Sequence, residues 1–466
     1  MKKFTSLLLA VVMICSLLAG CGTPAAPAVN TDYVKFADHV TADMYSADYW
    51  VKKNEKPWLS LNEIKEINAL NDKAIGVNGK TLALTELDEQ LTAEDLCATL
   101  QELADSVTDK TGYLHGQPID NAYWQTQIEN SNIEGVPDEL NLRYGFSVKR
   151  ASLRLFPCDD FIGESETDLF YDEMLMSEFL PYMPLIVAHE SADHQWYFVY
   201  MYGFGGWIRK QYVALCPSRE DWDARRNPED FLVVTGRDIR LNMDRGDEKL
   251  SNLLLPMGTV LPLVKPEDAP ESVNGRYSYN SYIVKLPIRS ASGRIRDHFA
   301  YIPSSADVSV GYLPYTGKAV IELALKRLGD RYGWGGLDYS QDCSGMVREI
   351  YSCFGFFLPR TTTPQANMLG GTTYDLSEKT AEEKLALLKK LPAGTMLHFP
   401  GHVMLYLGIK DKRPYVISAV GSFCPESLPA GEVESINTVV INDLYIRRRN
   451  GSTWLDNLNC AVVFKK

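Results

Sequence analysis

The stretch GDRYGWGGLDYSQDCSGMVR (residues 329–348) organises the last third of the chain. It follows an apolar helical pattern that Thr316 can cap, and it ends where Cys343 begins a second amphipathic pattern reaching Phe354. Five short β segments follow, at 395–399, 402–409, 414–420, 438–446 and 460–464. Helices followed by an antiparallel sheet predict an α+β domain over residues 312–466.

Cys343 is the strongest candidate for a catalytic residue. The glycine-rich loop places it at a helix N-terminus, where the helix dipole and free N–H groups favour a thiolate and could stabilise an oxyanion. A buried structural cysteine is the alternative. A cysteine nucleophile needs a base, and this domain offers only His398 and His402. His402 follows Pro400-Gly401 at the start of a strand and can face a cleft, whereas His398 is expected to be structural.

The segments before residue 312 have different secondary-structure patterns. Residues 31–145 carry helical patterns, notably at 60–72 and 92–108. Short strands broken by turn residues then predict two small β-barrels, at 146–217 and 228–303, with the charged stretch 218–230 as a linker. At 466 residues, three or four domains are expected.

The N-terminus is predicted to be a targeting signal. Lys2 and Lys3 precede an apolar run, and 17–21 (LLAGC) resembles a bacterial lipobox, which implies a signal peptide at 1–20, a tether at 21–30 and lipidation of Cys21. An ordinary secretory signal is the alternative. The expected location is extracytoplasmic, anchored to a bacterial membrane. The formal net charge is −13, or −13 − 2 = −15 without the two signal lysines, which argues against a nucleic-acid partner.

Four motifs in order carry a resemblance to a known family. They are YGWGG at 332–336, DCSG at 342–345, LPRT at 358–361, and GHV at 401–403 with YLG at 406–408. Together they resemble the NlpC/P60 cysteine peptidases. The upstream strands are similar to the bacterial SH3-type domains that accompany one branch of that family, and residues 31–145 to its N-terminal stabilising segment.

The resemblance implies a papain-like fold and cleavage of the γ-D-glutamyl-L-diamino acid bond in peptidoglycan stem peptides or muropeptides. Cys343 would attack the carbonyl and His402 would move the proton. Asp342 and Ser344 would bind the ammonium of a free N-terminal L-Ala. The alternative is that Asp342 simply caps the helix that begins at Cys343. Tyr332 and Trp334 would wall the site, and Arg360 would bind a substrate carboxylate or pair structurally.

The chain departs from the family at the third catalytic position. The family usually has a histidine on the strand after the catalytic one, and Ser418 stands there in this sequence. Ser418 is therefore the candidate third member, with Asn442 a remote substitute. This departure motivates a second hypothesis, a non-catalytic cell-wall peptide-binding protein, and an acyltransferase of related fold is a third.

Neither a metal nor a cofactor is expected. His189 and His194 resemble a zinc motif, but they are five residues apart on a strand and turn, so they do not share a helix face. The aromatic run 196–202 could be a glycan platform, although at strand spacing half of it should be core. These motifs do not identify the diamino acid, and they do not distinguish free muropeptides from the intact sacculus as substrate. They also do not give the oligomeric state or any disulfide pairing.

Overall fold

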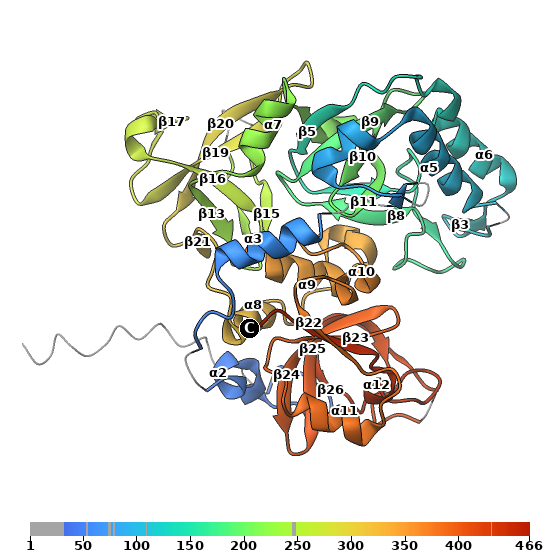
Figure 1. The fold of residues 1–466 in the computed structure, drawn as a ribbon, viewed down its shortest axis with the longest axis vertical. Coiled ribbons are helices and arrows are strands. Elements are labelled where there is room, and N and C mark those ends of the chain that lie inside the picture. Colours follow the sequence, from blue (N-terminus) through green and yellow to red (C-terminus); the bar gives the residue numbers. More distant parts are fainter. Residues whose placement is uncertain are drawn as a thin grey trace, which may run out of the picture.

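The computed structural model describes residues 32–52, 55–72, 76–77, 80–108, 110–244, 248–429 and 431–466. The predicted signal peptide, tether and lipidated Cys21 lie outside these residues. Figure 1 shows two β units side by side, with the C-terminal domain below them and helices from the N-terminal region along their edges. Within the described residues, no helix is both long and apolar enough to span a bilayer.

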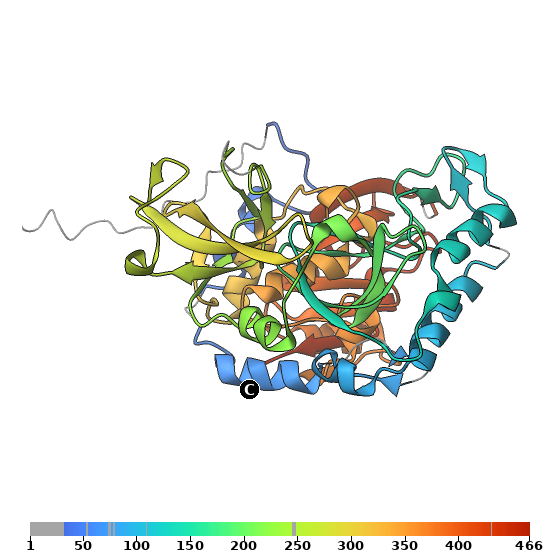
Figure 2. The same cartoon turned by 90° about the horizontal axis from the view of Figure 1, so that it is seen from above.

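The N-terminal region is helical at both predicted places. Helix α3 (Leu61–Leu70) begins at a capping box of Ser60 with Glu63, and α5 (Ala93–Asp105) begins at one of Thr92 with Asp95. The other elements here are η1 Ala42–Tyr45, α2 Ala47–Trp50, β1 Gly76–Val77, β2 Lys80–Thr81, η2 Leu84–Glu86, α4 Leu87–Gln90, β3 Tyr113–Leu114, β4 Gln117–Pro118, α6 Asn121–Asn130 and η3 Ile133–Gly135. Figure 2 shows α3, α5 and α6 along the outer edge of the molecule.

This region does not form a core of its own. Val40, Met44, Trp58 and Ile64 are buried in the core of the C-terminal domain, while residues 82–100 pack under the first β unit. Their apolar side chains are removed from water only by these contacts, so the segment is an integral support for both units.

The first β unit is a seven-stranded antiparallel sheet in the order β12-β5-β9-β10-β11-β6-β8. Its strands are β5 Arg143–Ser147, β6 Ala151–Arg154, β8 Leu175–Phe179, β9 Pro184–Glu190, β10 Trp196–Met201, β11 Phe204–Arg209 and β12 Val213–Leu215, and β7 Ile162–Gly163 pairs with β3. The sheet starts at Arg143, inside the segment assigned above to the N-terminal helices. All six residues of β10 are buried, so this strand is core on both faces and does not present a glycan platform.

The second β unit has a five-stranded sheet in the order β20-β19-β16-β13-β21. The strands are β13 Phe231–Val234, β16 Val260–Val264, β19 Ser281–Arg289, β20 Ile295–Pro303 and β21 Val308–Val310; the small ribbons are β14 Asp238–Arg240 with β15 Leu254–Pro256, and β17 Ser272–Val273 with β18 Arg276–Tyr277. The element η4 Lys210–Tyr212 lies before the stretch predicted as a linker, and the helix α7 Arg219–Arg226 lies within it. Trp222 of α7 is fully buried and donates a hydrogen bond to the carbonyl of Gly145, so this stretch is docked rather than extended.

The C-terminal domain packs helices against a six-stranded antiparallel sheet ordered β22-β27-β23-β24-β25-β26. The strands are β22 Thr372–Asp375, β23 Met396–Phe399, β24 His402–Lys410, β25 Arg413–Phe423, β26 Glu434–Asp443 and β27 Cys460–Val463; the helices are α8 Gly317–Leu325, η6 Trp334–Tyr339, α9 Cys343–Ser352, α10 Thr362–Ala366, α11 Ala381–Leu388 and α12 Trp454–Asn457. β22, α10 and α12 were not expected. Along β24, Val403 and Leu405 face α9 while Met404 and Tyr406 face α11 and α12, so both faces of the sheet are buried.

Candidate active site

Cys343 is the first residue of α9, and Asp342 is the N-cap whose carboxylate accepts from the N–H of Gly345 at 2.8 Å. The cysteine lies in a cavity of about 590 Å³ that is lined by the C-terminal domain and the first β unit. Only 6% of Cys343 is exposed, which is less than its polar neighbours led us to expect. The seven cysteines of the described residues are all free thiols.

His402 lines the same cavity as Cys343. It is the first residue of β24, placed there by the turn at Gly401, whose φ of +84° lies in the left-handed region that favours glycine. The imidazole lies between the rings of Phe399 and Trp454, each with its centroid 5.1 Å away. These rings hold the imidazole in one orientation.

Ser418 lies behind the imidazole, on the neighbouring strand β25. Its Oγ is 3.1 Å from Nε2 of His402, and the residue is fully buried. If Ser418 accepts from the Nε2–H group, Nδ1 carries the lone pair that a general base needs. Asn442, the remote alternative, is buried on β26, donates to the carbonyl of Asp443, and does not line the cavity.

Burial controls the protonation of both groups. Burial and then the charge of Asp342 raise the pKa of the Cys343 thiol to about 12, although the N–H groups of Val403 and Ser344 lower it. Burial, followed by His398 and Arg448, lowers the pKa of His402 to about 3. The expectation of a resting thiolate is therefore not met, because desolvation outweighs the helix N-terminus. At neutral pH the cavity is therefore lined by a thiol and a neutral imidazole.

Asp342, Ser344 and Arg360 form one buried cluster. Arg360 donates to both carboxylate oxygens of Asp342, at 2.9 and 2.5 Å, and to the Oγ of Ser344 at 3.0 Å. The N–H of Gly335 and the hydroxyl of Ser344 also donate to Asp342. Burial raises the pKa of Asp342, but Arg360 and the N–H groups of Gly345 and Gly335 hold it below its ordinary value. Asp342 is thus the helix cap and Arg360 its structural partner, the alternatives considered above for both residues.

Aromatic side chains from two parts of the chain form one wall of the cavity. Tyr332 and Trp334 lie there as predicted, and Tyr171 of the first β unit packs against both, with ring centroids 6.4 and 5.7 Å away. Met176 also lines the cavity from that unit. Tyr171 and Met176 were not predicted, since no local motif marks a residue that reaches a site from another domain.

Hydrogen bonds to and from a buried ion pair of the first β unit fix that unit to the loop before Cys343. Arg150 pairs with Glu178, and its guanidinium also donates to the carbonyls of Tyr339 and Ser340. Gln341 donates to Glu178 from the other side at 2.8 Å. The position of this loop, and so of the aromatic wall, is therefore coupled to the first β unit.

Three consecutive arginines, Arg447, Arg448 and Arg449, also line the cavity. Arg448 lies over the ring of Phe399, 5.3 Å from its centroid, and its charge contributes to the lowered pKa of His402. Asp342 is the one carboxylate that lines the cavity in the described part of the chain, and Arg360 already pairs with it. The cavity is thus electropositive. The RRR run at 447–449 is the sequence signal of this charge.

His398 and His189 occupy structural positions. His398 is 2% exposed on β23, and burial lowers its pKa to about 4. His189 on β9 bonds to the carbonyl of Asn132, whereas His194 is in the following turn beside Glu190. Across the described residues, no group of three or more His, Cys, Asp or Glu side chains is arranged to hold a metal ion.

Comparison with known proteins agrees with this architecture. Residues 329–463 match the NlpC/P60 family, and residues 163–209 match the SH3 domain of the SH3b1 type. A protein of Corynebacterium glutamicum named "probable endopeptidase" is 40% identical over 113 residues, which are 24% of this chain and 47% of the relative. This chain therefore spans about half the length of the curated relatives that it matches.

A solved structure of low sequence identity shares the fold. A structure of an NlpC/P60 endopeptidase from Photobacterium damselae subsp. piscicida superimposes with a TM-score of 0.68 at 17% identity, covering 90% of this chain and 96% of that one. A Bacillus cereus protein of the NlpC/P60 family gives 0.47 at 16% identity, covering 69% and 100%. The chain therefore contains an NlpC/P60 domain preceded by an SH3b1-type domain.

Proposed function

We propose that this chain, with its NlpC/P60 domain as the catalytic part, is a cysteine peptidase that cleaves the γ-D-glutamyl-L-diamino acid bond of peptidoglycan stem peptides. The observation that carries the proposal is the convergence of Cys343 and His402 in one cavity, with Ser418 bonded to the far nitrogen of the imidazole. A nucleophile, a base and a group that orients the base are the parts that acyl transfer requires.

The protonation states support a concerted first step. His402 is neutral and can accept the thiol proton at Nδ1 while the Cys343 sulfur forms a bond to the γ-glutamyl carbonyl carbon. The N–H groups at the start of α9 would stabilise the oxyanion. His402 then protonates the leaving amine, and a thioester remains. Water, deprotonated by His402, attacks the thioester, releases the glutamyl carboxylate, and the thiol is restored.

The wall of the cavity supports a short substrate with a free N-terminus. Tyr171 and Met176 bring the first β unit into the lining of the cavity, and we propose that this unit blocks the path of a longer chain on that side. Because Arg360 already neutralises Asp342, we propose that the L-Ala ammonium lies on the faces of Tyr171, Tyr332 and Trp334 and displaces Ser344 from Asp342.

The arginines in the lining of the cavity support an acidic substrate. Arg448 and Arg449 face the cavity that holds the reacting groups, and a γ-linked D-glutamate keeps its α-carboxylate free. A diamino acid such as diaminopimelate would add another carboxylate. This pairing of an aromatic wall for an ammonium with an arginine wall for carboxylates matches a zwitterionic peptide.

The central experiment is the hydrolysis of L-Ala-γ-D-Glu-diamino acid tripeptides followed by product mass spectrometry. Cys343→Ala should abolish turnover, while Cys97→Ala, a change of another helical cysteine in α5, should keep it. Transfer of the acyl group to an added amine instead of water would indicate an acyltransferase. Turnover by Cys343→Ala would refute the proposal. Rapid solubilisation of intact sacculi would contradict the short-substrate part.

A non-catalytic peptide-binding protein of the same fold is the second candidate, favoured by Ser418 at the third position and by the raised pKa of the thiol. Labelling with iodoacetamide separates the two. Alkylation of Cys343 that depends on His402 and is blocked by the peptide supports catalysis, whereas an inert thiol with intact peptide binding supports the second candidate.

We also propose attachment to a bacterial membrane through a diacylglycerol on Cys21. This rests on the LLAGC motif alone. A Cys21→Ser chain should fail to incorporate labelled fatty acid and should leave the membrane fraction. Unchanged membrane fractionation would contradict the anchor without affecting the proposed activity.

A further inference from the structure

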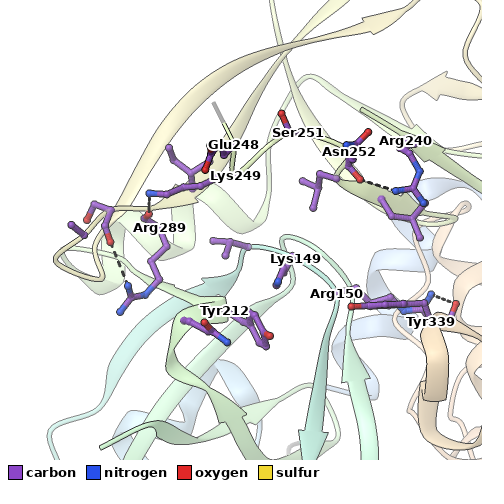
Figure 3. A pocket seen from close by; sticks show the side chains of 17 residues that line it. Lys149, Arg150, Tyr212, Arg240, Glu248, Lys249, Ser251, Asn252, Arg289 and Tyr339 are labelled. Carbon is purple, nitrogen blue, oxygen red and sulfur yellow. Dashed lines mark hydrogen bonds between the residues drawn. The ribbon is translucent and has the colours of Figure 1, made fainter. Parts of the chain in front are cut away.

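A second large cavity lies away from Cys343, at the junction of the two β units. Its volume is about 650 Å³, and Tyr339, in the loop before Cys343, closes one side. Figure 3 shows Lys149 and Tyr212 of the first β unit facing Arg240, Lys249 and Arg289 of the second across it. No residue of the described chain lines both this cavity and the one around Cys343, so the two are separate sites.

The charge of this cavity is unusual for so acidic a chain. Among the described residues, five cations line it, namely Lys149, Arg150, Arg240, Lys249 and Arg289, against the one carboxylate of Glu248. Arg150 is already neutralised by Glu178. Even when Glu248 is counted against Lys249, three positive charges remain in a protein whose net charge is −13.

These three cations are positioned by groups that do not neutralise them. Lys149 lies over the ring of Tyr212, with Nζ 4.3 Å from the centroid. Arg240 donates from one nitrogen to the carbonyl of Asn252 at 3.0 Å. Arg289 donates to the carbonyls of Val213 and Ser290. Among the described residues, none of the three forms an ion pair with a carboxylate.

The contacts leave donors available for a ligand. A guanidinium has five N–H groups in a planar fork, and Arg240 uses one of them on Asn252. Such forks bind carboxylate and phosphate oxygens with two parallel hydrogen bonds, and the low-dielectric walls of a cavity concentrate the positive potential. The volume suits a small ligand or a short segment of a polymer.

We propose that this cavity binds a ligand with two or more oxyanion groups, carboxylates or phosphates, bridging Lys149 on the first β unit and Arg240 on the second. This site goes beyond the proposed peptidase activity and does not depend on it. A ligand seated there would contact both β units at once and would lie beside the loop that leads to Cys343.

The test is isothermal titration of the full chain with tripolyphosphate and, separately, with citrate, at low salt. The double variant Lys149→Gln/Arg240→Gln should weaken binding at least tenfold. The matched control Lys265→Gln/Lys389→Gln removes two exposed lysines outside the cavity and should bind within twofold of the wild type. Binding should also weaken as salt is raised, because exposed charges are screened.

The two probes identify the chemistry of the ligand. Binding of tripolyphosphate alone assigns the site to phosphate-bearing ligands, binding of citrate alone to carboxylates, and binding of both to oxyanions in general. Binding of neither, or equal weakening by the cavity variant and its control, overturns the proposal. Titration of the Cys343→Ala variant should give the wild-type affinity, so the result stands apart from the peptidase assay.

Discussion

Removal of the Ser418 hydroxyl isolates the contribution of the third residue to catalysis. In the resting site, Ser418 and the neutral imidazole of His402 share one hydrogen bond of 3.1 Å. When His402 takes the thiol proton, the same bond is made to a cation. Hydrogen bonds between neutral groups contribute about 0.5–1.5 kcal/mol, and those to charged groups about 1.5–3 kcal/mol. The bond is therefore about 1–1.5 kcal/mol stronger in the transition state.

That difference sets the expected loss of rate. At about 1.4 kcal/mol per factor of ten, Ser418→Ala should lower kcat about 5- to 13-fold, with little change in KM. Ser418→Thr keeps the hydroxyl and should recover most of the rate. Ser422→Ala, an exposed position on the same strand and the same cavity, is the control and should not change kcat.

The assay is the hydrolysis of the tripeptide under saturating substrate, with thermal unfolding to confirm that the variant is folded. A kcat unchanged within twofold would show that Ser418 does not orient or stabilise the imidazolium. A loss above about 1,000-fold, as large as removal of a general base causes, would show that it does more than that. Either result would refute the reasoning.

Three further predictions concern charge and burial around the site. Arg448→Gln should raise KM for the tripeptide about tenfold and should raise the pKa of His402, which is measurable in the acid limb of kcat/KM; an unchanged KM would remove Arg448 from substrate binding. Arg150→Ala leaves Glu178 buried without its main partner, so chemical denaturation should show a loss of about 3–5 kcal/mol in the free energy of unfolding. A loss under about 1 kcal/mol would contradict the structural role of this ion pair. Burial holds the pKa of His398 at about 4, below that of an unfolded histidine, so its neutral form stabilises the fold above pH 6.5 and this contribution is lost as pH falls toward 4. His398→Leu should therefore show a smaller drop in Tm between pH 7 and pH 5 than the wild type, and an equal drop would contradict this.

The C-terminal domain could be predicted from sequence because its signals are local. The cap at Thr316, the start of α9 at Cys343 and the alternation along β24 each depend on neighbouring residues. The NlpC/P60 domain and one SH3-type domain are confirmed by the family comparisons. The second barrel, the site roles and the lipid anchor stay predictions.

What the sequence could not supply depends on contacts between distant segments. Tyr171 lines the cavity around Cys343 from the first β unit, which Arg150 and Glu178 fix to the loop at 339–341. The protonation of Cys343 likewise reflects how completely the cavity is enclosed, and a motif carries no measure of enclosure. The helix α7 was missed since a short charged stretch has no apolar period, and a single residue, Trp222, docks it.

The N-terminal region and the C-terminal domain share one core, so segments far apart in the chain belong to the same folded unit. Trp58 packs on Tyr315, Leu59 bridges to Tyr315, and Asn68 donates to the carbonyl of Gly355. The two β units are thus an insertion within one folding unit, tethered at both ends. During synthesis, the residues around Trp58 must wait until the chain has emerged beyond Tyr315 and Gly355 before they find these partners, so folding of the C-terminal domain is late and of high contact order. After a proteolytic cut between the β units, the N-terminal region and the C-terminal domain would stay together through their shared core. A chain that started at residue 312 would lack part of that core.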